Sequence, residues 1–196
     1  MAVKTYSYKK DKSKMLSSHF SVGEFASASG SKLYSDVVKV DTVILDYLEK
    51  LYTVFECTKV IINSGYRTAA HDKAVGGSGS GMHVSGKAAD AVFYGKDGNV
   101  IPSWKICCAA QDMKINGVAY ISERAVHLDN GNRATVYRGD ERYGMNSIKG
   151  RDFYSYFGKK KNQVYTMLRP KVSVWDIKGD KIRVNTNEWI TFSSLR

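Results

Sequence analysis

The sequence predicts an α+β fold in which a small antiparallel sheet and flanking helices surround a cleft, followed by a C-terminal β-hairpin. Two stretches carry apolar residues at the three- and four-residue steps of a helix, and four short runs have the composition and length of strands. The chain has 196 residues, of which 43% are hydrophobic and 25% charged, so it can bury one core of ordinary size.

The longest helical stripe runs through residues 34–55, where Val, Ile, Leu and Phe recur on one face. A second helix is expected from Pro102 to Met113, because proline favours the first turn and apolar residues follow at helical spacing. Residues 16–25 predict a short helix or turn that buries Phe20 and Phe25.

The four expected strands are bounded by glycines or polar turns. They span residues 59–64, 88–94, 117–121 and 124–129. Residues 76–81 read Gly-Gly-Ser-Gly-Ser-Gly, and we place this loop at the rim of a site. Residues 171–196 alternate apolar and polar side chains around Gly179-Asp180, which predicts the hairpin.

Lysine and arginine outnumber the acidic residues by 30 to 19, which gives a net charge of +11 and a pI near 9.5. Such a field attracts polyanions, including nucleic acids, anionic lipids and anionic cell-wall polymers. Lysines gather near both ends of the chain, a pattern that solvated tails also show. We therefore expect a basic N-terminal segment (1–15), a central domain (16–158) and a basic, β-rich appendage (159–196).

The chain contains no apolar stretch of about 18 residues, and its N-terminus lacks the apolar core of a secretory signal. We therefore expect no membrane span and synthesis in the cytoplasm. Three cysteines, Cys57 and the adjacent Cys107 and Cys108, match neither a disulfide framework nor a zinc or redox motif. This pattern favours reduced, buried thiols.

Metal ligands would have to come from a short set, because the chain has only four histidines. His83 precedes Asp90 by seven positions, an odd separation that excludes one face of a single strand. The spacing suits a ligand on a loop that turns at Gly86 and a second ligand on the strand that follows. By itself this pair is weak evidence for a metal site.

Three further motifs accompany this pair: Ser64-Gly-Tyr-Arg-Thr68, Gly86-x-Ala-x-Asp90 and Val126-His-Leu-Asp129. Together they resemble the zinc D-Ala-D-Ala metallopeptidases, a family related to the zinc domain of hedgehog that includes cell-wall carboxypeptidases and phage endolysins. The resemblance covers residues 16–158, including the Ser-His-Phe of residues 18–20. It implies that this part is a zinc peptidase domain that acts on peptidoglycan stem peptides.

The resemblance assigns the zinc ion to His83, Asp90 and His127. Two histidines and one carboxylate leave a fourth tetrahedral position open, which is typical of catalytic rather than structural zinc. A carboxylate must also move a proton to the leaving amine. We expect Asp129, two residues from His127 and on the same strand face, to do so, with Glu123 as the second choice.

Substrate contacts are expected from the same motifs. The resemblance implies that Arg67 neutralises the oxyanion or holds a peptide carboxylate, and that Ser64 and Tyr66 bind substrate. The family usually has Ser where this chain has Gly81, so we expect Ser80 or Ser78 to take its place.

A second departure from the family pattern concerns the proton-transfer group. Some branches place an acidic residue three positions before the distal histidine, where this chain has Arg124. The identity of the general base therefore stays open between Asp129 and Glu123.

The remaining two histidines are not expected to bind metal. His71 is predicted to lie at an exposed helix start, and His19 to cap a helix or pack beneath the site.

The expected activity is that of a D,D-carboxypeptidase or an L-Ala-D-Glu endopeptidase, similar to an endolysin. The alternative is a non-catalytic zinc-containing module of the hedgehog type that binds the wall or a protein partner. A nucleic-acid binder is not expected, because no face interleaves aromatic and basic residues. We expect a monomer that reaches the wall through holin-type lysis or another export route, with residues 159–196 as a wall-binding segment.

Overall fold

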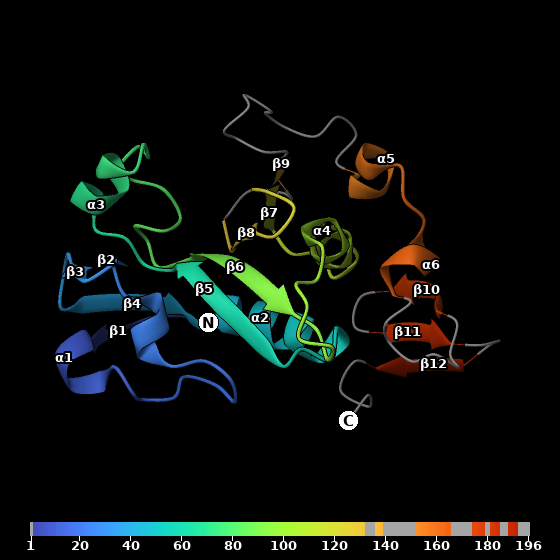
Figure 1. Cartoon of the computed structure of the whole chain (residues 1–196), viewed down its shortest axis with the longest axis horizontal. Coiled ribbons are helices and arrows are strands. Elements are labelled where there is room, and N and C mark those ends of the chain that lie inside the picture. Colours follow the sequence, from blue (N-terminus) through green and yellow to red (C-terminus); the bar gives the residue numbers. More distant parts are fainter. Residues whose placement is uncertain are drawn as a thin grey trace.

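The computed structural model describes the greater part of the chain. The described residues are 2–131, 136–138, 152–165, 174–178, 181–184 and 188–191. Figure 1 shows the first strands and short helices at one end, a twisted sheet in the middle and the C-terminal elements at the other end. This mixture of helices and small, mainly antiparallel sheets confirms the predicted fold class.

The central sheet has five strands. Their order is β5 (Lys59–Ser64), β6 (Ala88–Tyr94), β8 (Val126–Asp129), β7 (Gly117–Tyr120) and β9 (Val136–Arg138). Neighbours run antiparallel except β7 and β9, which are parallel. The first two predicted strands agree with the structure to the residue, and the next two differ from it by one or two residues at one end.

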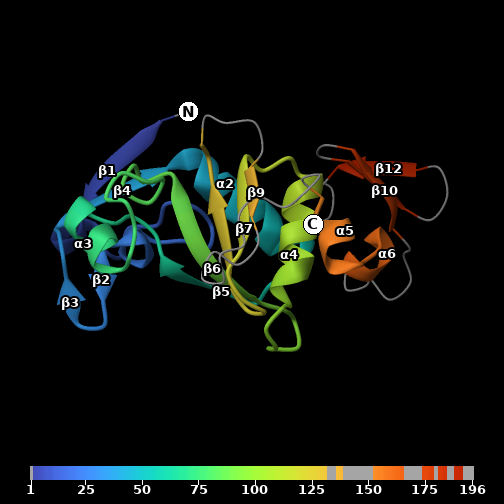
Figure 2. The same ribbon diagram turned by 90° about the horizontal axis from the view of Figure 1, so that it is seen from above.

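Helices α2 (Thr42–Val54) and α4 (Ser103–Asp112) contact each other and pack on this sheet, α2 against β6 and α4 against β7 and β8 (Figures 1 and 2). Alternate residues of the strands form the interface: Ala89, Ala91 and Phe93 of β6 and Val126 and Leu128 of β8 are all buried in the core. Side chains alternate between the faces of a strand, so Asp90 and His127 lie on the opposite face.

The helix predicted over residues 34–55 is wrong in its first part, where the structure has strand β4 (Val37–Asp41). Val38 and Val40 are buried at alternate positions, and β4 pairs with β1 (Val3–Ser7). The helix begins only after Asp41, whose carboxylate accepts a hydrogen bond from the Val43 N–H at 2.9 Å. Val37, Val40 and Val43 are three residues apart and therefore fit a helix, but Val38 and Val40 also fit the alternation of a strand.

Residues 1–15, expected as a separate basic segment, contribute β1 and helix α1 (Tyr8–Asp11) to the fold. The helix or turn expected in residues 16–25 is the 3-10 helix η1 (Val22–Phe25), and both Phe20 and Phe25 are buried.

A small hairpin of β2 (Ala28–Ser29) and β3 (Lys32–Leu33) follows η1, and helix α3 (Ala69–Ala74) follows β5. All three cysteines are free and buried, as predicted. Burial raises the pKa of Cys57 to about 12, so this thiol stays protonated at neutral pH.

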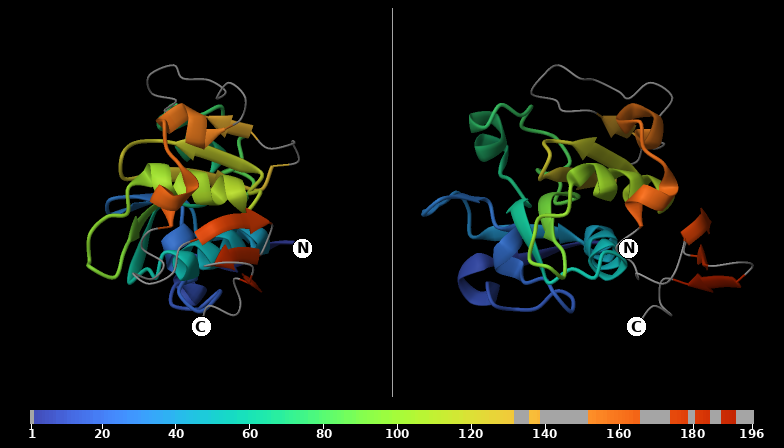
Figure 3. Two further views of the ribbon diagram at one scale, coloured as in Figure 1. Left: turned by 90° about the vertical axis from the view of Figure 1, so that its right-hand side faces the viewer. Right: turned by 45° about the vertical axis from the view of Figure 1, so that its right-hand side comes forward.

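Helices α5 (Phe153–Phe157) and α6 (Lys161–Val164) pack on α4 (Figure 3). The hydroxyls of Tyr154 and Tyr165 both donate to the Asp112 carboxylate, and Lys161 lies 3.7 Å from its second oxygen. Val164 and Tyr165 are buried in the main core. The core therefore continues past residue 158, where the appendage was predicted to begin.

The C-terminal strands β10 (Val174–Lys178), β11 (Lys181–Val184) and β12 (Glu188–Thr191) pair in this order, all antiparallel. The turn predicted at Gly179-Asp180 lies outside the described residues. Within the described part of the chain, no helix has the length and apolar character needed to span a bilayer.

Candidate metal centre

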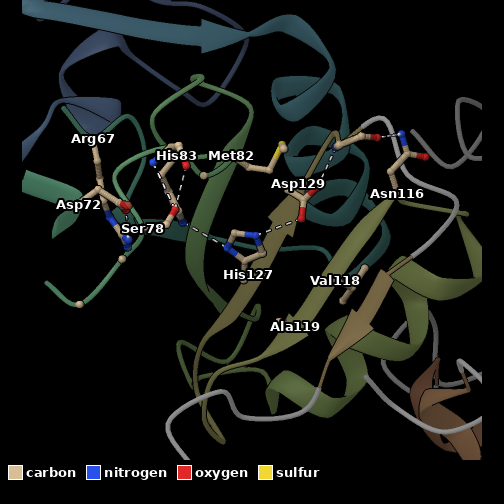
Figure 4. A pocket seen from close by; sticks show the side chains of 15 residues that line it. Arg67, Asp72, Ser78, Met82, His83, Asn116, Val118, Ala119, His127 and Asp129 are labelled. Atoms are coloured by element: carbon tan, nitrogen blue, oxygen red, sulfur yellow. Dashed lines mark hydrogen bonds and ion pairs between the residues drawn. The ribbon is translucent and has the colours of Figure 1, made fainter. Parts of the chain in front are cut away.

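A cleft of about 590 Å³ opens on the sheet face that α2 and α4 do not cover (Figure 4). One wall is the Gly/Ser loop of residues 76–81 together with Met82 and His83. The other consists of Asn116, β7 and the end of β8, including His127 and Asp129. The loop therefore lies at the rim of a site, where the sequence placed it.

The structure brings His83, Asp90 and His127 together from three different elements. His83 lies in the turn after the Gly/Ser loop, whereas Asp90 and His127 are direct cross-strand partners on β6 and β8. Among the described residues, this is the one group of three or more potential ligands whose donor atoms lie within 4.8 Å of one another.

Two of the three separations between the donor atoms are close to those that a tetrahedral metal requires. His83 Nε2 lies 3.3 Å from Asp90 Oδ1 and 3.2 Å from His127 Nδ1. Asp90 Oδ1 and His127 Nδ1 are 2.8 Å apart. Zinc bonds of about 2.0–2.2 Å at tetrahedral angles would separate the donors by about 3.3–3.6 Å. Two of the three separations agree within about 0.1 Å, so the residues fit a zinc ion.

The outer nitrogen of each histidine has an acceptor that fixes which nitrogen faces the centre. His83 Nδ1 donates to the Gly65 carbonyl at 2.7 Å, and His127 Nε2 donates to Asp129 Oδ2 at 3.2 Å. The lone pairs of His83 Nε2 and His127 Nδ1 are then directed at the shared centre, as in metal sites whose histidines have polar second partners.

Charges around the cleft also favour a divalent cation. Burial raises the pKa of Asp90, but the nearby His83 and His127 outweigh this effect and hold the pKa well below its usual range. Burial lowers the pKa of His127, yet its hydrogen bonds to Asp129 and Asp90 raise it to about 10, so a metal ion bound at Nδ1 would displace a proton from this ring. Asp72, Asp90 and Asp129 against Arg67 leave two negative charges when the histidines are neutral, which a divalent cation would balance.

Arg67 is held at the edge of the cleft by three side chains. Its Nε donates to Ser64 Oγ at 2.7 Å, one terminal nitrogen to Asp72 Oδ1 at 3.2 Å and the other to Asp90 Oδ2 at 2.8 Å. Asp90 therefore directs Oδ1 to the histidines and Oδ2 to Arg67. The guanidinium orients the ligand carboxylate and still lines the cleft.

The three residues predicted to bind substrate have different positions. Ser80 lines the cleft, where its backbone N–H donates to Ser78 Oγ at 3.2 Å. Ser64 ends β5 and contacts Arg67 rather than the cleft. Tyr66 is buried, with Lys39 Nζ 5.7 Å from the centre of its ring, and it is not among the residues that line the cleft.

Of the two predicted proton-transfer groups, only Asp129 reaches the cleft. Its Oδ2 accepts from His127, and its Oδ1 accepts from the Gly131 N–H at 2.7 Å. The carboxylate lies against the Cα of Gly117, where a Cβ would come within 1.9 Å of Oδ2. Glu123 is exposed in the turn between β7 and β8 and does not line the cleft.

His71 and His19 lie outside the cluster of ligands, as predicted, but their surroundings differ from the prediction. His71 is in α3 but buried rather than exposed: its ring stacks on Tyr34 at 4.0 Å, and Nδ1 lies 2.9 Å from Ser27 Oγ. His19 is exposed and stacks on Tyr52 of α2, so it does not pack beneath the site.

Sequence reasoning missed Asp72, Asn116 and Met82, which also line the cleft. Asp72 follows His71 in a short helix, where a carboxylate is ordinarily a solvated surface charge. A signal was present in the two glycines at residues 76 and 77, because a loop that passes close to another group needs residues without side chains. Asn116 and Met82 carried no comparable signal.

Comparison with known proteins supplies the family. A family model described as Peptidase M15 matches residues 18–129, which is more than half of the chain. No curated protein and no solved structure matches it significantly. The match contains all three residues of the candidate metal site and both strands that carry Asp90 and His127. The chain belongs to the Peptidase M15 family.

Proposed function

We propose that this protein is a zinc-dependent peptidase that hydrolyses peptide bonds next to D-amino acids in peptidoglycan. The observation that carries the proposal is the cluster of His83, Asp90 and His127, whose two histidines line an open cleft, in a chain of a peptidase family. Two histidines and a carboxylate, each with a polar outer partner, are the ligand set of catalytic zinc sites.

A zinc ion held by His83, Asp90 and His127 would supply Lewis acidity, lowering the pKa of water towards ~7 and polarising the scissile carbonyl. Arg67 adds a fixed positive charge at the cleft edge, where it can stabilise an oxyanion or hold the carboxylate of a stem peptide. The Gly/Ser loop opposite β7 supplies backbone groups and the hydroxyls of Ser78 and Ser80 for a peptide main chain.

Proton transfer is assigned to Asp129, with Glu123 as the alternative. Asp129 lines the cleft beside His127, next to the space that a bound peptide would occupy. Its two hydrogen bonds, to His127 and Gly131, fix the position of the carboxylate beside the proposed metal ligands. Glu123 would need a change in the β7–β8 turn to reach the same position.

Digestion of muropeptides by purified, zinc-loaded protein tests this function, with mass spectrometry of the products. A D,D-carboxypeptidase releases free D-Ala and shortens the stem by one residue. An L-Ala-D-Glu endopeptidase instead leaves L-Ala on the muramic acid and releases the rest of the stem, which then begins at D-Glu. Loss of either activity in the presence of a chelator, with recovery on zinc addition, supports the proposal. A wild-type protein that carries zinc and cleaves no muropeptide contradicts it.

The second candidate is a zinc-containing binding module without turnover. The specific observation in its favour is that Asp129 and Arg67 both make hydrogen bonds that fix the proposed metal ligands: Asp129 to His127 and Arg67 to Asp90. Such residues are also compatible with a site that keeps its metal for structure. Retained binding to purified cell walls, without release of any product, identifies this function.

We further propose that the C-terminal residues attach the enzyme to the cell wall. Ending the chain after Tyr165 should leave cleavage of a small soluble peptide close to the wild-type rate, because the cleft and the described core are kept. Co-sedimentation with purified walls should fall, because the rest of the appendage is lost. An equal loss of cleavage and wall binding would assign these residues to the catalytic fold.

A second truncation after Gly158 provides the control. It also removes Val164 and Tyr165 from the core and takes two partners, Tyr165 and Lys161, from Asp112, so it should lower the midpoint of thermal unfolding as well. Comparing the two truncations separates wall attachment from stability of the core.

A further inference from the structure

A buried carboxylate that the chemistry above does not use connects one wall of the cleft to the metal ligands. Asp72 is 4% exposed, and both of its oxygens are engaged. Oδ1 accepts from Arg67 at 3.2 Å, and Oδ2 accepts from the backbone N–H of Gly79 at 2.9 Å. One side chain therefore contacts the Gly/Ser loop and the arginine that holds Asp90.

The loop is wrapped closely around this carboxylate. The Gly77 N–H donates to the Asp72 carbonyl at 2.8 Å, and a Cβ on Gly77 would lie 2.2 Å from Asp72 Oδ2. Gly76 and Gly79 have φ of +88° and +80°, so the loop turns through conformations that other residues rarely adopt. The path of this wall therefore depends on the position of the Asp72 carboxylate.

The same carboxylate acts on the ligands through Arg67. The Arg67 side chain bridges Asp72 and Asp90, and its backbone N–H donates to the His83 carbonyl at 3.1 Å. The side chains of Asp72 and Arg67 are 5% and 18% exposed, so the ion pair is largely shielded from solvent. A shift of Asp72 would turn the guanidinium and, with it, the Asp90 oxygen that faces the histidines.

We propose that Asp72 is a positioning residue that couples the substrate-facing Gly/Ser loop to the orientation of the metal ligand Asp90 through Arg67. Its part in substrate binding rests on the proposed peptidase function. Its effects on the loop and on metal affinity do not.

Two substitutions separate the two contacts. In Asp72→Ala both acceptor oxygens are lost, so the Gly79 amide should exchange its hydrogen faster. Zinc affinity should fall roughly 10–100-fold, the usual effect of removing a residue that orients a metal ligand. In Asp72→Asn the amide oxygen still accepts from Gly79, but the NH₂ group cannot accept from Arg67. This variant should keep slow Gly79 exchange and still lose zinc affinity.

Measurements are amide exchange followed by NMR and zinc affinity from competition with a chromophoric chelator, using the full chain. Asp46→Ala, an exposed carboxylate paired with Lys50 on α2, is the matched control and should change neither value. In the peptidase assay, Asp72→Ala should raise KM and lower kcat, whereas Asp72→Asn should mainly lower kcat.

A third variant tests the loop alone. Gly77→Ala keeps every charge but displaces the loop from Asp72, so it should raise KM more than it lowers zinc affinity. If Asp72→Ala fails to fold, the near-isosteric Asp72→Asn and Gly77→Ala still decide the question. Zinc affinity and Gly79 exchange that are both unchanged in the folded Asp72 variants overturn the coupling. Absence of product from wild-type protein overturns the peptidase function instead and leaves the exchange and zinc tests valid.

Discussion

Replacing His83 by alanine is expected to abolish stoichiometric zinc binding and, with it, peptide hydrolysis. The side chain supplies one of three donors, and the two that remain, Asp90 and His127, are 2.8 Å apart and can form a direct ion pair in place of a metal site. Elemental analysis of the purified variant measures the loss. Zinc should raise the thermal midpoint of the wild type but not that of His83→Ala, because only a folded state that binds the ion is stabilised.

His71→Ala is the matched control. Its ring lies against Tyr34 and Ser27 outside the metal cluster, so the variant should lose some stability through the buried stacking contact while it keeps stoichiometric zinc. Full zinc content in His83→Ala would show that the metal is held elsewhere.

Asp129→Asn is expected to lower turnover by roughly 10²–10⁴-fold, the usual contribution of a positioned acid-base group. If proton transfer is its main role, the zinc content and the substrate affinity stay near those of the wild type, and one limb of the pH–rate profile disappears. If orienting His127 is its main role, zinc affinity falls by about 10–100-fold and the profile keeps its shape. Chelator competition and the pH dependence of kcat distinguish the two.

Two further variants complete this experiment. Gly117→Ala displaces the Asp129 carboxylate without changing its chemistry, so a low rate with a preserved pH profile is expected. Glu123→Gln should keep nearly the wild-type activity, because Glu123 lies outside the cleft. An inactive Glu123→Gln beside an active Asp129→Asn would move the proton-transfer role to Glu123 and leave the metal chemistry as proposed.

The sequence predicted the strands β5 and β6 and the helix α4 closely, because a glycine follows each strand and a proline precedes the helix, which marks one end of each element. It failed for residues 37–41, where valines three residues apart fit a helix as well as a strand. The deciding contact is the pairing with Val3–Ser7, which lies in the N-terminal segment that was expected to be separate from the central domain. Such long-range pairing is not encoded in the local pattern.

Within the site, spacing alone gave weak evidence for a metal, and the family resemblance of the surrounding motifs led to His83, Asp90 and His127 as a set. The roles of Asp72 and Gly117 were missed, because each depends on a contact with a residue that is not its neighbour in the sequence, Gly79 and Asp129 respectively. The hydrogen bond from the Gly131 N–H to Asp129 was not predicted either, because the position of Asp129 two residues from His127 suggested only a role in proton transfer.

The pairing of Asp90 with His127 across β6 and β8 limits where this protein can change in length. A shift of one residue in either strand would send the two ligands to opposite faces of the sheet and leave the cleft without a metal centre. An inserted residue should therefore be tolerated in the Gly95–Asn99 turn, which precedes α4 and touches neither ligand. The same insertion next to Leu128 should remove zinc binding while the helices still fold.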